Sequence, residues 1–351
     1  MKTRINLLLL FLCFTILSNA QFKDEATNLT KNFMEEQKIP GLSISVSKKG
    51  RIIWSEGFGY SDLKNKIKIS PKNTQFRIAS ISKTLTAVAL AKLIDDNKLN
   101  LNNSLYTYVP DFPKKDYDFT IRQIAGHTAG IRHYKGSEFL INDKMSIVEG
   151  LDIFKESDLL FKPGTNFKYS TYGWNLLSVV IQNISKKDFF DFMNDEVFVP
   201  LKMTKTMVDK SDTENTNRTQ FYLKRRGKII IGPKVSNEFK AAGGGFLSTS
   251  EDLILFGNEF INPQIITTNS LAKLTTSNKT NNGKKTNYGI GISIRKTKNN
   301  TTKLSHSGGG IGASSMLLIY PDEEIVISIL TNLSGVKMRN YIKGLENIFI
   351  Q

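Results

Sequence analysis

Alternating apolar and polar residues predict strands at both ends of the chain. Leu42, Ile44 and Val46 alternate with serines, and a turn at residues 48–50 leads into a second apolar stretch over residues 52–58. This pattern predicts a β-hairpin. Strand patterns return over residues 288–295, 314–320 and 325–331. Because hairpins dominate these connections, we expect one largely antiparallel sheet built from both chain ends.

Helical patterns fill the rest of the chain. Amphipathic stretches predict helices over residues 22–37 and 341–350, and residues 84–94 form a long apolar run typical of a buried helix. From residue 95 to residue 253 the pattern is mostly helical and is interrupted by proline and glycine. The polar residues 276–287 predict an exposed loop.

The expected fold class is therefore α+β. We predict an α/β sandwich whose largely antiparallel sheet comes from residues 21–70 and 285–351, together with a mostly helical lobe over residues 71–284. The cleft between two such lobes is the expected place for a functional site.

The N-terminus resembles an export signal. Lys2 and Arg4 precede an apolar stretch over residues 5–17, and small residues occupy 18–20. We predict a signal peptide over residues 1–20 and an exported mature chain over 21–351, periplasmic or secreted. An uncleaved membrane anchor is the alternative. The single cysteine, Cys13, lies inside this segment, so neither disulfides nor thiol catalysis is expected in the mature protein.

The formal net charge of +16 at pH 7 raises the question of an anionic partner. Basic residues are scattered along the chain, and the one tight cluster is residues 224–226 with Lys228. Scattered charge and predicted export argue against a nucleic-acid partner. Attraction to anionic cell-surface polymers or lipid head groups is the interpretation that we favour.

One serine–lysine pair carries candidate chemistry. Ser80 and Lys83 are three residues apart at the start of the apolar run, so on a helix they share a face. A hydroxyl beside an amine is the minimum apparatus for nucleophilic acyl transfer. The alternative is a helix N-cap serine followed by a solvated lysine. The same spacing recurs, without a buried helix behind it, at Ser45…Lys48, Ser61…Lys64, Ser270…Lys273 and Ser334…Lys337.

Three short motifs follow one another along the chain. They are Ser80-x-x-Lys83, Tyr169-Ser170-Thr171 and His306-Ser307-Gly308-Gly309. With them the chain resembles the serine β-lactamase and penicillin-binding protein superfamily, of the class C type, and is nearest to the mitochondrial serine β-lactamase-like branch. The resemblance extends from about residue 39 to the C-terminus, and its further segments are residues 39–41, 54–57, 77–79, 127–134, 242–249 and 312–315.

The resemblance implies a set of catalytic roles. Ser80 would be the nucleophile, and Lys83, shielded from water and with a lowered pKa, would be its base. Tyr169 would be a second candidate base, and it would also return a proton to the leaving group. The backbone N–H groups of Ser80 and Gly309 would form the oxyanion hole.

The resemblance also implies substrate-binding residues. These are Thr171, His306, Ser307 and Gly308, of which Gly308 would let the backbone approach the acyl group. Thr171 stands where the class C pattern has Asn, and His306 stands where it has Lys. Both departures argue against efficient antibiotic hydrolysis.

Other interpretations of these residues remain open. Tyr169 could be a core aromatic and His306 a structural histidine. The three histidines, His127, His133 and His306, suggest zinc, but their spacing and the lack of a neighbouring acid argue against it. Gly308-x-Gly310-x-x-Ala313 mimics a dinucleotide-binding turn, yet a strand pattern follows where a helix is required. We therefore expect neither a metal nor a cofactor.

Together these observations predict an exported serine hydrolase that acts through an acyl-enzyme at Ser80. The expected substrate is a small-molecule or peptide-like acyl compound, with peptide-like amides first and esters or β-lactams second. The alternative is a catalytically weak binding or scaffold protein with the same fold.

Overall fold

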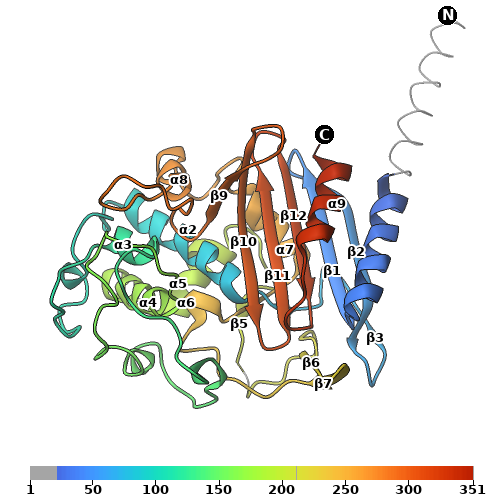
Figure 1. Ribbon diagram of the computed structural model, residues 1–351, viewed down its shortest axis with the longest axis horizontal. Helices are drawn as coiled ribbons and strands as arrows, with labels where there is room; N and C mark the ends of the chain where they lie inside the picture. Colours follow the sequence, from blue (N-terminus) through green and yellow to red (C-terminus); the bar gives the residue numbers. More distant parts are fainter. Residues whose placement is uncertain (1–21, 211, 351) are drawn as a thin grey trace, which may run out of the picture.

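The computed structural model describes residues 22–210 and 212–350. Its centre is a seven-stranded antiparallel sheet in the order β3-β2-β1-β12-β11-β10-β9 (Figure 1). The strands from the two chain ends meet where β1 pairs with β12. This confirms the predicted α+β class and the largely antiparallel sheet. The strands are β1 (Gly41–Lys48), β2 (Arg51–Asp62), β3 (Ile67–Lys68), β9 (Ser293–Lys296), β10 (Thr302–Gly310), β11 (Ala313–Tyr320) and β12 (Ile325–Thr331).

Both faces of the sheet are covered. The apolar residues of β1 belong to a core shared with the helix over residues 22–37 and with α9 (Arg339–Phe349), and Phe33 stacks on Tyr341 with 4.2 Å between ring centroids. The alternating serines of β1 face α7 (Ser250–Asn258), where the hydroxyl of Ser43 lies 2.7 Å from that of Ser250. The serines are thus buried rather than exposed to solvent.

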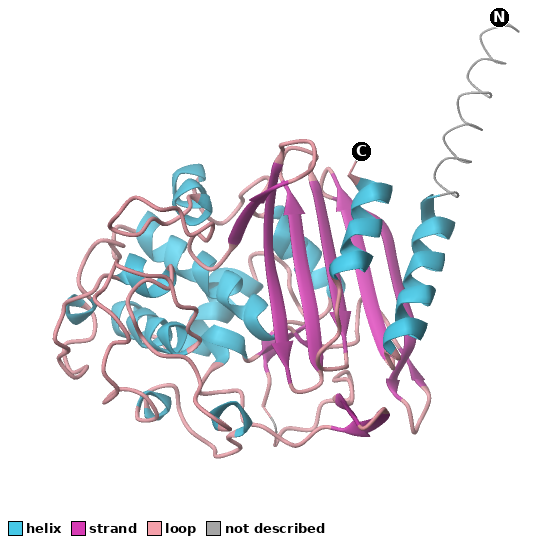
Figure 2. Cartoon of the chain, in the orientation of Figure 1, coloured by secondary structure: helices cyan, strands magenta, loops and turns pink. Residues whose placement is uncertain are grey.

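A helical region flanks the sheet on one side (Figure 2). Its central element, α2 (Ser82–Asp95), is buried on nearly all sides, as expected of a helix that is apolar around its circumference. The other helices of this region are α3 (Ile121–Ala125), α4 (Tyr172–Ser185), α5 (Phe189–Met193), α6 (Ala241–Gly244) and α8 (Thr268–Thr275). Ser80 lies just before α2, in the 3-10 turn Ala79–Ile81.

The middle of the chain also contains strands that the pattern did not predict. β4 (Phe76–Arg77), β8 (Phe246–Ser248) and β5 (Met207–Val208) form a small sheet, and β6 (Tyr222–Arg225) pairs with β7 (Lys228–Ile231) as a hairpin. Strands of two to four residues are too short to show a period of two.

The predicted signal segment, residues 1–20, lies outside the described residues. Within residues 22–210 and 212–350, no helix is long and apolar enough to cross a membrane.

Candidate active site

The turn that carries Ser80 is fixed from two sides. The preceding residue, Ala79, has a positive φ of 46°, which is uncommon for a residue with a side chain. The carbonyl of Ile78 accepts a hydrogen bond from the Ser315 hydroxyl at 2.8 Å, and its N–H donates to the carbonyl of Phe246 at 3.1 Å. These bonds hold the partly exposed Ser80 side chain at the start of α2.

Lys83 lies one turn later and is completely buried. Its ammonium nitrogen is 3.2 Å from Ser80 Oγ and 3.1 Å from Thr171 Oγ1, and it also donates to the carbonyl of Gly243. Burial lowers the pKa of Lys83 well below its ordinary value of 10.5. The neutral amine needed to accept a proton from Ser80 is therefore accessible at lower pH than for a solvated lysine.

The Tyr169 ring lies next to both Lys83 and Ser80. Lys83 Nζ lies 4.8 Å from the ring centroid, and the ring packs on His127 with 4.3 Å between centroids. The phenol oxygen is buried, and the described residues supply it with no hydrogen-bond partner. Burial raises the pKa of Tyr169, although the nearby Ser80 hydroxyl opposes the shift. A protonated phenol is thus favoured over a phenolate.

Two histidines position the Tyr169 segment. Nδ1 of His127 accepts the backbone N–H of Ser170 at 3.2 Å, and Nδ1 of His133 accepts that of Thr171 at 3.1 Å. Burial, together with the charge of Lys83, lowers the pKa of His133 to about 4 and the pKa of His127 well below its ordinary value, so both rings serve as neutral acceptors. The described residues include no group of three or more His, Cys, Asp or Glu side chains that could hold a metal ion.

His306 lies next to Tyr169, with 6.3 Å between ring centroids, and is not among the residues that line the Ser80 pocket. Its Nδ1 lies 2.8 Å from the carbonyl of Ser307, so this nitrogen carries the proton, and its Nε2 accepts from the Tyr288 hydroxyl at 2.9 Å. Burial lowers the pKa of His306 to about 3, so the ring is neutral where the class C pattern places a cation. Ser307 is exposed and lines a separate groove beside α9.

The glycines at the end of β10 form the strand edge beside Ser80. β9 pairs with β10 only as far as Ser305, so residues 306–310 have an unpaired edge. Gly309 borders the same pocket as Ser80 and Thr171, whereas Gly308 is buried against the Ser80 turn. The structure therefore brings Ser80, Lys83 and Tyr169 together with the Gly309 strand edge, and the roles assigned to them remain predictions.

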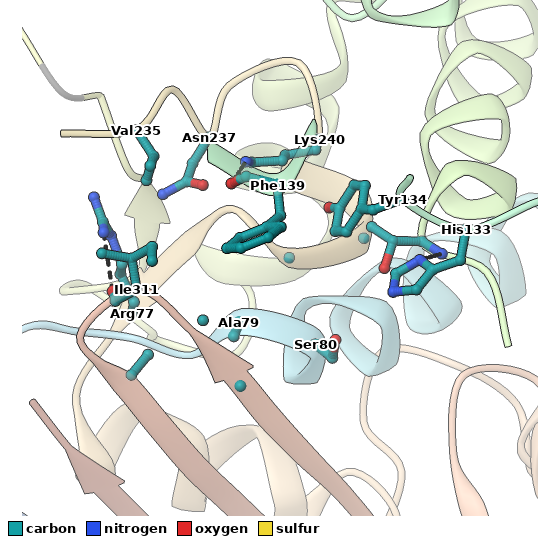
Figure 3. A pocket seen from close by; sticks show the side chains of 16 residues that line it. Arg77, Ala79, Ser80, His133, Tyr134, Phe139, Val235, Asn237, Lys240 and Ile311 are labelled. Atoms are coloured by element: carbon teal, nitrogen blue, oxygen red, sulfur yellow. Dashed lines mark hydrogen bonds between the residues drawn. The ribbon is translucent and has the colours of Figure 1, made fainter. Parts of the chain in front are cut away.

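The far wall of the pocket contains residues that sequence reasoning missed. Figure 3 shows Lys240 and Phe139 across the pocket from Ser80. The buried ammonium of Lys240 donates to the carbonyl of Phe139 at 3.1 Å, and burial lowers its pKa to about 8. Nearby, Arg77 forms a buried ion pair with Asp209 at 2.6 Å. These partners are far apart in sequence and form no local motif.

Comparison with known proteins identifies the family. A model of the Beta-lactamase family matches residues 26–345, which is most of the chain. The chain therefore belongs to the Beta-lactamase family of serine hydrolases, and the resemblance drawn from the sequence motifs is confirmed.

Individual relatives agree with this assignment. The chain is 29% identical over 426 residues to the human (Homo sapiens) serine beta-lactamase-like protein LACTB, mitochondrial, covering 90% of this chain and 78% of that protein. It is 27% identical over 319 residues to protein flp of Staphylococcus aureus strain N315, covering 89% and 64%.

Solved structures agree on the fold. The octameric penicillin-binding protein homologue from Pyrococcus abyssi superposes with a TM-score of 0.81 at 23% identity, covering 93% of this chain and 77% of that chain. EstCE1, a hydrolase with promiscuous acyltransferase activity, superposes with a TM-score of 0.83 at 17% identity, covering 95% and 100%.

Proposed function

We propose that this protein hydrolyses amide or ester bonds of peptide-like substrates through an acyl-enzyme at Ser80. The observation that carries the proposal is the 3.2 Å contact between the Ser80 hydroxyl and the buried amine of Lys83. No carboxylate is needed in this pair, because desolvation alone favours the neutral amine.

The proposed reaction proceeds in two similar halves. Ser80 Oγ forms a bond to the acyl carbon while its proton passes to Lys83 Nζ. The bond to the leaving group then breaks, the leaving group takes the proton of the Tyr169 hydroxyl, and Lys83 reprotonates Tyr169. Water repeats the sequence at the acyl carbon and releases Ser80. The N–H groups of Ser80 and Gly309 would hold the developing oxyanion.

The substrate class rests on the family and on the shape of the site. The open strand edge at residues 306–310 offers backbone groups to an extended, peptide-like acyl chain. The neutral His306 supplies no cation at the position where the class C pattern has Lys, so amides and esters rank before antibiotics.

A fluorescent phosphonate probe tests the nucleophile. The wild-type protein should be labelled, and Ser80→Ala should not be labelled. Ser270→Ala is the matched control, because Ser270 has the same spacing to a lysine but lies on α8. Equal labelling of wild type and Ser80→Ala would refute the assignment of Ser80 as the nucleophile.

Measuring substrate turnover distinguishes the hydrolase from the alternative, a catalytically weak binding or scaffold protein. A panel of amide and ester substrates should be hydrolysed by the wild-type protein, and Lys83→Ala should abolish that hydrolysis. Probe labelling without turnover of any panel member would favour a scaffold with a residual site, because Ser80 would then be reactive without completing a catalytic cycle.

We also propose that the protein is exported after cleavage behind Ala20. The support is the basic residues Lys2 and Arg4 followed by an apolar stretch. Intact mass of the protein from the producing cells should give Gln21 as the first residue. A chain that retains residue 1 in its final location would contradict the proposal.

A further inference from the structure

One edge of the molecule combines exposed cations with exposed aliphatic side chains. It consists of residues 62–68, which run from the end of β2 through β3, and of the β6–β7 hairpin over residues 222–231, and we name it the basic edge. Figure 1 shows both turns at the lower end of the sheet. Its exposed cations are Lys64, Lys66, Lys68, Lys224, Arg225, Arg226 and Lys228.

The two turns are fixed to each other and to the sheet. The N–H of Leu63 donates to the Tyr222 hydroxyl at 2.9 Å, and the N–H of Gln220 donates to the carbonyl of Ser61 at 2.8 Å. The N–H of Tyr222 donates in turn to the carbonyl of Asn332, next to the end of β12, at 2.9 Å. The base of the basic edge is therefore rigid.

The tip of the hairpin presents its charges on a tight turn. Arg226 and Gly227 both have positive φ, 49° and 78°, the conformation of a two-residue hairpin turn. Arg225 pairs with Lys228 across it. None of the cations of the basic edge forms an ion pair with a carboxylate in the described part of the chain. The one acidic residue in these turns, Asp62, accepts hydrogen bonds from Lys64 and Asn65 in its own turn.

Aliphatic side chains lie among these cations. Ile231 is 63% exposed, Ile67 50%, Leu63 40% and Ile230 37%. A hydrated polyanion would be bound by the charges alone and would gain nothing from the aliphatic groups. A lipid surface uses both, because aliphatic groups enter the head-group region while Lys and Arg contact anionic lipids.

We infer that the basic edge docks this protein on an anionic phospholipid bilayer. The inference concerns binding and does not depend on catalysis at Ser80. Its functional consequence follows from continuity of the chain: β7 leads into residues 232–237, and Val235 and Asn237 of this segment line the pocket. Docking would therefore place the pocket mouth close to the lipid head groups.

Vesicle flotation tests the inference with the chain over residues 21–351. Vesicles of phosphatidylcholine alone are compared with vesicles that also contain phosphatidylglycerol. We expect binding to the anionic vesicles only, with loss of binding at high salt, because exposed charges are screened. Equal binding to both vesicle types, or to neither, would overturn the inference.

Matched variants locate the surface. Lys224→Gln/Arg225→Gln/Arg226→Gln should weaken vesicle binding at least tenfold. Lys279→Gln/Lys284→Gln/Lys285→Gln removes the same charge from the exposed loop over residues 276–287 and should leave binding nearly unchanged. Equal weakening by both triple variants would mean that net charge, rather than the basic edge, drives binding.

Replacing the exposed isoleucines distinguishes a lipid surface from a soluble polyanionic polymer as the binding partner. Ile230→Ser/Ile231→Ser keeps the net charge and should weaken vesicle binding several-fold, with an unchanged melting temperature as the check on folding. Unchanged vesicle binding in this variant, together with binding of a soluble polyanion such as heparin, would assign the basic edge to a polymer and refute lipid docking.

Discussion

Gly308 on β10 lies directly against the carbonyl oxygen of Ile78. A Cβ built on Gly308 would be 2.2 Å from that oxygen and 2.1 Å from the hydroxyl of Ser315, far inside contact distance. The strand and the Ser80 turn therefore meet through backbone atoms. This contact sets the distance between the open edge of β10 and the Ser80 hydroxyl.

Gly308→Ala should consequently damage both fold and site. The added methyl group must displace either β10 or the Ser80 turn, so we expect a loss of ~1–3 kcal/mol in the free energy of unfolding and strongly reduced probe labelling. Gly309→Ala is the matched control, because no atom lies within 4 Å of a Cβ at that position. Denaturant unfolding of both variants checks the prediction, and equal stability would contradict it.

Much of the fold could be predicted from local patterns. Leu42, Ile44 and Val46 identify β1 by their alternation, yet alternation cannot show that the intervening serines are buried under α7. The small sheet of β4, β5 and β8 was not predicted, because its strands are too short to show the alternation of apolar and polar residues that identifies a strand. Long-range pairing decides these features, and no single window of sequence contains it.

The site was predictable to the extent that it is local. Ser80 and Lys83 are joined by helical spacing, whereas Tyr169 was assigned through the resemblance. The buried ring of His306 accepts a hydrogen bond from Tyr288 at its Nε2, and no motif connects these two residues. The hydrogen bond from Lys83 to Gly243 is equally non-local.

Tyr169→Phe should slow acylation without destabilising the protein. Its hydroxyl has no hydrogen-bond partner among the described residues, so its removal breaks no bond in the free enzyme. Loss of a positioned proton donor should reduce the rate by roughly 10²- to 10⁴-fold. Rapid-quench acylation kinetics together with a thermal melt check both parts. An unchanged rate would exclude Tyr169 from the reaction, and a lowered melting temperature would indicate a structural role.

The pH dependence of acylation should report Lys83 rather than a histidine. The rate should rise with pH as Lys83 loses its proton, with the midpoint below 10.5 because burial lowers its pKa. The pKa values of His306 and His133 are about 3 and 4, so neither should titrate between about pH 5 and 8.

The variant His306→Gln tests whether Lys83 or His306 sets the pH dependence of acylation. The variant should keep the position of the ascending limb even if the absolute rate falls. Acylation rates measured across this range for both proteins provide the check. Disappearance of an inflection near pH 6.5 in His306→Gln would assign the titration to the histidine instead.

Lys83→Met should abolish acylation and stabilise the fold at neutral pH. The folded protein depresses the pKa of Lys83 below its ordinary 10.5, so protonation favours the unfolded chain. Protonation of this lysine therefore costs the folded state no stability above pH 10.5. As the pH falls from 10.5 toward the pKa in the folded state, the wild-type protein loses stability. Replacing it should add ~0.5–2 kcal/mol near neutral pH, the usual scale of a stability–activity trade-off.

The pH trend distinguishes this account from simple packing. The stability advantage of Lys83→Met should shrink as the pH rises toward 10.5, because the folded wild-type protein then no longer has to deprotonate or bury a charged amine. Lys31→Met, at an exposed position on the helix over residues 22–37, should change stability by less than about 0.5 kcal/mol. Denaturant unfolding of the three proteins at several pH values tests the trend. A constant difference between wild type and Lys83→Met would show that folding does not favour the neutral amine over the protonated one, and the lowered pKa on which its role as base depends would then be wrong.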